Sequence, residues 1–165
     1  MRKRIATPVL MLSLMVIITG SVNQQSAFGK VLFGPNDQRL VVNKVRISSG
    51  EIITVTGRRF DPEVGLYLSF CKIPAPGAQP TPCGGINMEE RSNTGYWISS
   101  NAPSYAKGLT IPFKRNGSFQ VKLKVNRMIG EYRCESNECA VTIRADHLRT
   151  GDRSHDLLIP IRFTR

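Results

Sequence analysis

The sequence predicts an all-β fold, a sandwich of two sheets built from about seven short strands. Three observations predict it. Apolar and polar residues alternate with a period of two over much of residues 40–163. Turn residues interrupt this alternation every 8–12 residues or so. Apolar residues never recur at helical spacing for more than a turn. Together these patterns are typical of a small sandwich domain.

Residues 1–29 are predicted to be a secretory signal peptide. Arg2, Lys3 and Arg4 give a positive start, residues 7–20 are largely apolar, and Ala27-Phe28-Gly29 offers a cleavage site. The apolar run is shorter than the roughly 20 residues that a membrane-spanning helix needs. We therefore expect cleavage, with an uncleaved anchor as the alternative. Residues 30–165 are then expected to form one monomeric domain that is secreted or associated with the cell surface.

The mature chain is expected to be basic. The whole sequence carries a formal charge of +11, and removing the signal leaves 20 basic and 12 acidic residues, a net charge of +8. Such a charge attracts anionic partners. The basic residues are scattered, and the longest runs after the signal are Arg58-Arg59 and Lys114-Arg115. Because nucleic-acid modules combine a dense basic stripe with aromatic platforms or a recognition helix, a solvated basic surface is favoured over nucleic-acid binding.

Residues 30–38 are predicted to be a short, frayed leader. A strand is expected from Leu40 onward, because Val45 and Ile47 alternate with two basic residues. A turn at Gly50 ends it.

Two further strands are expected before the first cysteine, one over 53–57 and one over 66–71, separated by a turn at Asp61-Pro62. Residues 72–106 then break the pattern, because prolines and glycines are frequent there. A short strand over 95–99 is expected within this segment. So long an irregular stretch inside a compact domain is typical of a functional segment.

The second half of the domain returns to regular alternation. A strand is expected over 109–113, and Asn116-Gly117 is a strong hairpin signal before the next strand. The last expected strands are 119–125, 132–134, 139–144 and 157–163. Pro160 lies at an outward position of the final strand, which indicates an edge or a bulge.

Four cysteines permit three disulfide connectivities, and geometry favours local pairing. Cys134 and Cys139 flank a four-residue turn, so strand pairing brings them within bridging distance. Cys71 and Cys83 flank an arc that must return if the sandwich is to close. Zinc binding is the alternative, but neither spacing matches a zinc knuckle. No metal or other cofactor is expected.

Several of these segments resemble the neocarzinostatin family of secreted actinobacterial apoproteins, which carry enediyne chromophores. The run from Gly50 to Pro62 is similar to the family's second-strand motif, and Leu66 to Cys71 is similar to its strand leading to a first half-cystine. Residues 116–125 and the Cys134–Cys139 spacing are similar to its later hairpin and second disulfide. The resemblance covers most of 40–165. It implies an immunoglobulin-like, seven-stranded β-sandwich with two local disulfides. It also implies that this chain is a divergent member of the family.

The chain departs from the family pattern in two places. The stretch between Cys83 and Asn116 is longer and contains Tyr96 and Trp97, and residues 145–156 are more charged. An aromatic with a polar end suits a binding cleft, and it equally suits a core plug. We therefore name Tyr96 and Trp97 as candidate ligand contacts while core packing of Trp97 is the favoured interpretation.

The charged loop 145–156 supplies the other candidate ligand contacts, Asp146, His147, Asp152 and Arg153. Its spacing does not match a calcium loop. Surface ion pairs with nearby arginines are the simpler interpretation. Ser154, His155 and Asp156 are triad residue types, but adjacent residues on an extended chain point to opposite sides, so no catalysis is expected.

The sequence thus favours an exported, non-catalytic binding domain that displays loops on a stapled sandwich. Its partner is expected to be an anionic envelope or host polymer. The alternative is a carrier of a small hydrophobic ligand.

Overall fold

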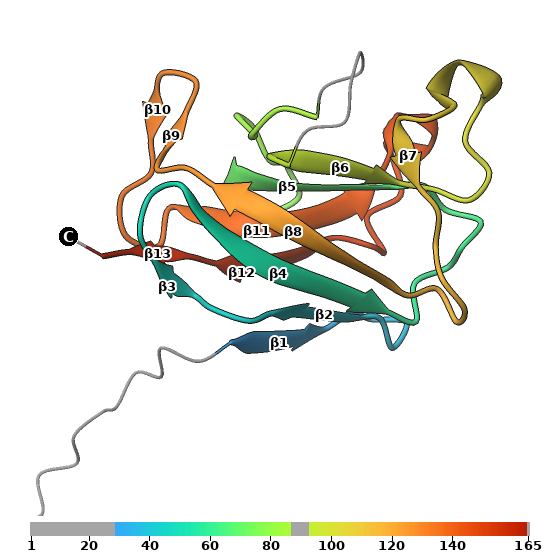
Figure 1. The fold of residues 1–165 in the computed structure, drawn as a ribbon, viewed down its shortest axis with the longest axis horizontal. Helices are drawn as coiled ribbons and strands as arrows, with labels where there is room; N and C mark the ends of the chain where they lie inside the picture. Colours follow the sequence, from blue (N-terminus) through green and yellow to red (C-terminus); the bar gives the residue numbers. More distant parts are fainter. Residues whose placement is uncertain (1–28, 87–92, 165) are drawn as a thin grey trace, which may run out of the picture.

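The computed structural model describes residues 29–86 and 93–164, so the predicted signal peptide lies, except for Gly29, outside the described residues. The chain is all-β and forms a sandwich (Figure 1), as the alternation predicted. One sheet has four antiparallel strands in the order β1 (Lys30–Phe33), β2 (Arg39–Val42), β4 (Glu51–Arg58) and β8 (Phe119–Val125). Among the described residues, no helix is long and apolar enough to cross a membrane.

The second sheet has five strands in the order β12, β11, β5, β6 and β7. Their bounds are Leu157–Pro160, Cys139–Ala145, Leu66–Lys72, Gly95–Ile98 and Thr110–Ile111. All neighbours in this sheet are antiparallel except β6 and β7, which are parallel. Two strand pairs lie beside the sheets: β3 (Arg46–Ile47) with β13 (Arg162–Phe163), and β9 (Met128–Ile129) with β10 (Tyr132–Arg133).

The core lies between the two sheets and is built from the inward positions that the alternation identified. Ile53 and Val55 of β4 and Leu66 and Leu68 of β5 are completely buried. Each such aliphatic side chain stabilises the fold by about 1.5–3 kcal/mol. The same alternation leaves the outward residues of β4 and β8 exposed or half-buried.

Both local disulfides are present, as expected: Cys71 is bonded to Cys83, and Cys134 to Cys139. The first ties the irregular segment to the end of β5. The second closes the turn that precedes β11. Each bridge links residues that are near in sequence, with separations of 12 and 5.

Two sequence predictions about the first half are corrected. Residues 30–33 form the edge strand β1 rather than a frayed leader, because all four pair with β2. The strand expected from Leu40 onward divides in two. Asn43 accepts a hydrogen bond from Thr54 N through its side chain at 2.7 Å. Beyond it the chain leaves this sheet and forms β3 against β13. With the short edge strands β1 and β7, the two sheets of the described chain hold nine strands instead of about seven.

The outer face of the five-stranded sheet is covered. Ser69, Trp97 and Thr142 point away from the core and are nevertheless buried. Two single 3-10 turns contribute to this cover, η1 (Ser104–Ala106) and η2 (His147–Arg149), because Tyr105 and His147 contact the ring of Trp97. The irregular segment also contacts the loop that follows η2, because Gln79 Nε2 donates to Thr150 O at 3.2 Å. The two long loops are therefore held against one sheet.

Candidate functional site

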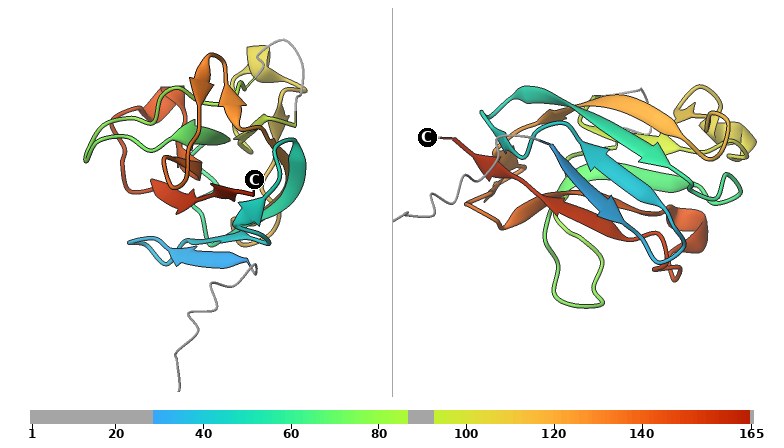
Figure 2. Two further views of the ribbon diagram at one scale, coloured as in Figure 1. Left: turned by 90° about the vertical axis from the view of Figure 1, so that its left-hand side faces the viewer. Right: turned by 90° about the horizontal axis from the view of Figure 1, so that it is seen from below.

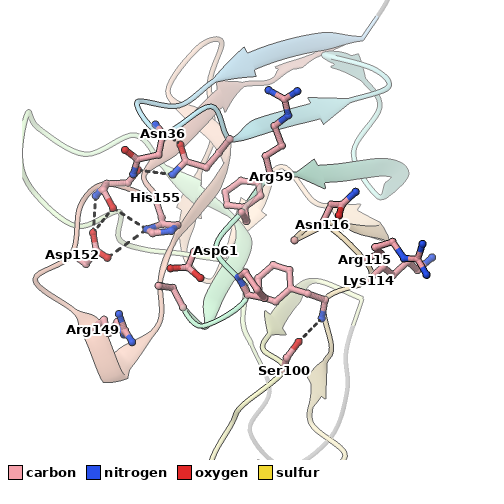
Figure 3. Close-up of a pocket in the computed structure, with 17 residues that line it drawn as sticks. Asn36, Arg59, Asp61, Ser100, Lys114, Arg115, Asn116, Arg149, Asp152 and His155 are labelled. Atoms are coloured by element: carbon pink, nitrogen blue, oxygen red, sulfur yellow. Dashed lines mark hydrogen bonds and ion pairs between the residues drawn. The ribbon is translucent and has the colours of Figure 1, made fainter.

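A pocket with a volume of about 770 Å³ lies at one end of the sandwich (Figure 3). Three segments meet there: the turn between β4 and β5, the turn before β8, and the loop after η2. The turn between β1 and β2 completes it through Asn36 and Gln38. The charged and aromatic side chains of the lining include Arg59, Asp61, Phe113, Lys114, Arg115, Arg149, Asp152 and His155.

The floor of the pocket is buried and internally bonded. Phe60 and His155 are 2% and 4% exposed, and their rings stack with centroids 6.4 Å apart. Gln38 is 1% exposed. Its Nε2 donates to Ser154 O at 3.1 Å, and its Oε1 accepts from Asn36 N at 2.9 Å. A buried amide that is hydrogen-bonded at both ends fixes the segments it joins, so the floor is preformed.

One wall is formed where the β4–β5 turn meets the hairpin turn before β8. Arg59 N donates to Asn116 O at 3.2 Å, and Phe60 N donates to Gly117 O at 3.1 Å. Gly117 has φ +58, and a Cβ there would lie 1.6 Å from Phe60 O. Only glycine satisfies both the left-handed backbone and this close approach. The Asn-Gly pair that predicted a hairpin thus also shapes the pocket.

The opposite wall carries a Ser, a His and an Asp in contact. Ser154 Oγ donates to Asp152 Oδ1 at 2.6 Å, and Ser154 N donates to the same oxygen at 2.9 Å. These two bonds hold the pKa of Asp152 below its ordinary value. Ser154 Oγ and Asp152 Oδ2 both approach His155 Nδ1, at 3.0 and 3.4 Å. A catalytic relay needs the serine and the carboxylate on different ring nitrogens, so this arrangement is a turn-stabilising network.

The rim of the pocket is positively charged. Arg59, Lys114, Arg115 and Arg149 surround the opening (Figure 3), and all four are exposed. Within residues 29–86 and 93–164 none of them forms an ion pair. Two carboxylates also line the pocket, and both accept hydrogen bonds from neutral donors, Asp152 from Ser154 and Asp61 from Glu63 N at 2.9 Å. Asp152 also lies near enough to Arg149 for that charge to contribute to its lowered pKa. The four cations of the rim outnumber the two carboxylates of the lining, which favours an anionic ligand.

The predicted aromatic contacts Tyr96 and Trp97 do not line this pocket. As neighbours on β6 they point to opposite faces of the sheet. Tyr96 packs against the core, and its hydroxyl donates to Lys122 O at 2.5 Å. Trp97 is 1% exposed on the outer face, where Nε1 donates to Asp146 Oδ2 at 2.8 Å. It belongs neither to the core between the sheets nor to an open cleft.

Asp146 and His147 belong to the cover over Trp97. Asp146 is 1% exposed, and its Oδ1 accepts from Leu148 N at 2.9 Å at the start of η2. His147 stacks on Tyr67 and hydrogen-bonds the hydroxyls of Tyr67 and Tyr105. Burial, with the nearby charge of Asp146, raises the pKa of Tyr67 to about 12. These contacts anchor the loop that continues into the pocket wall.

The six predicted ligand contacts are thus dispersed. Trp97, Asp146 and His147 lie together, Asp152 lies in the pocket, and Arg153 lines a different, apolar pocket. Sequence reasoning missed the cationic rim. A signal for it was present, because the two basic doublets of the mature chain each adjoin a predicted turn, Asp61-Pro62 or Asn116-Gly117.

The apolar pocket lies between the irregular segment and β12 and has a volume of about 470 Å³. Residues 73–78 form one side, and Leu158 and Pro160 form the other. Arg153 and Asp156 form an ion pair at its edge.

Comparisons with known proteins add one structural likeness. No protein-family model matches this chain, and no curated protein matches it. A solved structure of macromomycin is similar, with 16% sequence identity and a TM-score of 0.49, over 77% of this chain and 99% of that chain.

Proposed function

We propose that this chain is an exported, non-catalytic binding domain whose ligand is an acidic polysaccharide of a cell envelope or extracellular matrix. The observation that carries the proposal is the preformed pocket with a rim of four cations, none of which forms an ion pair within the described part of the chain. Two local disulfides in so small a domain support an oxidising, extracytoplasmic location.

The chemistry of the lining favours a sugar acid. Guanidinium groups such as those of Arg59 and Arg115 donate paired hydrogen bonds to a carboxylate or sulfate. Asn36, Ser100 and Asn116 provide polar groups for sugar hydroxyls, and the half-buried Phe113 offers an apolar surface for a sugar ring. Nucleic acid fits less well, because base recognition uses several stacking platforms. Phe113 is the one aromatic ring of this lining that is more than marginally exposed.

The geometry of Ser154, His155 and Asp152 does not support catalysis by a serine nucleophile. The Ser154 hydroxyl donates its hydrogen bond to Asp152. The same nitrogen of His155, Nδ1, faces both the Ser154 hydroxyl and the Asp152 carboxylate. No base is therefore placed to activate this hydroxyl as a nucleophile. Binding without turnover is the function that the pocket supports.

The test is calorimetric titration of the mature protein with a galacturonate trimer. The control ligand is the same trimer with its carboxyl groups reduced to alcohols. We expect binding of the acidic trimer alone, weakening as salt rises. The double variant R59Q/R115Q should bind the acidic trimer at least about tenfold more weakly, because each of the two substitutions removes a charge-assisted hydrogen bond to the ligand. The control double variant K107Q/R133Q makes the same change in net charge on exposed residues outside the pocket, and it should bind like the parent.

Two results would contradict the proposal. One is equal binding of the acidic and the reduced trimer, because the charge would then be irrelevant. The other is an equal effect of R59Q/R115Q and K107Q/R133Q, because the affinity would then reflect net charge rather than this pocket.

A second candidate function is the carrying of a small hydrophobic molecule, which the apolar pocket beside Leu158 favours. Such a pocket binds a ligand by removing apolar surface from water. A titration with the fluorescent probe anilinonaphthalene sulfonate tests it. Probe fluorescence that rises with the parent and falls on L158E would support this function, and an unchanged response in L158E would refute it.

A further inference from the structure

The outer face of the four-stranded sheet carries a second set of cations. Strand alternation turns Ile52, Thr54, Thr56 and Arg58 of β4 outward, and the paired positions follow from the register. Arg39 lies opposite Arg58, Lys122 opposite Thr54, and Lys124 opposite Ile52. No outward position of β1, β2, β4 or β8 is acidic. Glu51, the one acidic residue of these strands, is inward in the alternation and pairs with Lys44.

One pair on this face is unfavourable for the isolated protein. Arg39 and Arg58 are direct cross-strand partners, and like charges in that position destabilise a sheet. Neither is in an ion pair within the described part of the chain. Arg39 is instead placed over the ring of Phe33, with its guanidinium carbon 5.9 Å from the ring centroid. An anion bound between the two guanidinium groups would remove the repulsion.

This face is continuous with the pocket at two points. Gln38 lies in the pocket floor, and the next residue, Arg39, lies on the face. Arg59 lies at the pocket rim, and the preceding residue, Arg58, lies on the face. The reversal between residues 58 and 59 comes from the left-handed backbone of Arg59, with φ 60. The cations therefore continue from the pocket onto the sheet without an intervening carboxylate.

The dimensions of the face suit a chain rather than a single sugar. The distance along β4 from Arg58 to Ile52, which is paired with Lys124, is six residues. At the rise of a β-strand this is about 20 Å. The side chains between these cations are uncharged, since Val41, Thr54, Thr56 and Gln120 occupy the middle rows together with Lys122. Figure 2 shows β1, β2 and β4 side by side along this sheet, without a loop laid across them.

We infer that the outer face of β2, β4 and β8 binds the units of a linear acidic polysaccharide that follow the short segment held in the pocket, a segment the length of the trimer. This inference rests on the proposed function and adds that the ligand is polymeric. The pocket and Arg39, Arg58, Lys122 and Lys124 act as one extended surface. Affinity then grows with ligand length, because each added unit binds as part of the same molecule.

The test compares a galacturonate trimer with a dodecamer in calorimetric titrations of the mature protein. The face variants are R39Q/R58Q and K122Q/K124Q, the pocket variant is R59Q/R115Q, and the charge-matched control is K107Q/R133Q. For the parent we expect the dodecamer to bind at least about tenfold more tightly per molecule than the trimer. This comparison is corrected for the larger number of positions along the dodecamer at which the site can bind. Each face variant should retain trimer affinity and lose this gain, and its dependence on salt should flatten.

The outcomes separate the two proposals. Face variants that bind the dodecamer like the control variant overturn the inference, whatever the pocket variant does. If the pocket variant binds the trimer as the parent does, the proposed function is overturned. If the face variants nevertheless lose affinity for the dodecamer, the outer face of the sheet is still supported as a binding site. Thermal unfolding of every variant, monitored by circular dichroism, checks that a lost affinity is not lost folding.

Discussion

The buried bond between Trp97 and Asp146 is expected to be one of the largest single polar contributions to the stability of this domain. Asp146 is 1% exposed and accepts two hydrogen bonds, from Trp97 Nε1 at 2.8 Å and from Leu148 N at 2.9 Å. The substitution Asp146→Ala removes both acceptors. The indole N–H then stays buried without a partner, and the η2 turn loses its N-cap.

The magnitude follows from these two losses. A buried donor without a partner costs about 1–3 kcal/mol. An N-cap carboxylate contributes about 1 kcal/mol. Asp146→Ala should therefore lower the free energy of unfolding by about 2–4 kcal/mol, a large fraction of the 5–15 kcal/mol of a typical domain. Asp146→Asn should cost less, because its amide oxygen can still accept one of the two bonds.

Urea unfolding followed by the fluorescence of Trp97, the only tryptophan of the chain, measures this change. Asp61→Ala is the control, because Asp61 is an exposed carboxylate with a single local bond to Glu63 N. It should cost less than about 1 kcal/mol. A loss below about 0.5 kcal/mol for Asp146→Ala would refute the reasoning, because surface substitutions reach that value.

Gly65 provides an independent check of the same contact. A Cβ at this position would lie 1.9 Å from Asp146 Oδ2 and 3.2 Å from Trp97 Nε1. Gly65→Ala should therefore displace the carboxylate and destabilise the parent. In the Asp146→Ala background the obstructing atom is gone, and the same change should cost much less. A double-mutant cycle measures this coupling, and additive effects would show that the two sites are independent.

Three further predictions concern the site and its surroundings. Because the folded pKa of Tyr67 is about 12 and that of an unfolded tyrosine is about 10, stability should fall between these pH values as unfolded chains release the proton. Tyr67→Phe should lose less stability over that interval in urea titrations, and an identical decline in both proteins would contradict the assignment. Gly117→Ala should destabilise the domain by more than about 1 kcal/mol, because a left-handed φ and a clash with Phe60 O both oppose it. A thermal shift no larger than that of Ser118→Ala at the neighbouring half-buried position would be the contrary result. Since Ser154 lowers the pKa of Asp152, the stability from their bonds should be present above the unfolded pKa of the carboxyl and lost as pH falls through its folded pKa. The difference between parent and Ser154→Ala should thus disappear in acid, and a difference that persists unchanged there would exclude this linkage.

The sequence predicted those features of the fold that depend on neighbouring residues. Alternation along 51–58 and 119–125 is a local property, and it placed the inward and outward faces of β4 and β8 correctly. The two disulfides join residues that are close along the chain, so local pairing was predicted correctly. The expected pairing of the strands on either side of Cys134 and Cys139 was wrong, because β10 pairs with β9 and β11 pairs with β5 and β12. The edge strand β1 was missed because its four residues lack clear alternation, and it exists through pairing with β2.

Trp97 shows where local reasoning ended. Its residue type fits a core or a cleft, and no pattern around it reveals a third possibility. Its burial depends on His147 and Tyr105, which reach it from two separate loops. A sequence read in one dimension does not show which loops fold back over which face of a sheet.

For this protein the amino-acid pattern alone determined the all-β class, the two local disulfides and the positive charge, because each is fixed by composition or by residues close together in the sequence. The tertiary structure alone decided the pocket. Its floor depends on a bond between Gln38 and Ser154, 116 residues apart, and its rim gathers cations from turns that are distant in sequence but meet at one end of the sandwich. Such convergence is set by the packing of the two sheets, which no local pattern specifies.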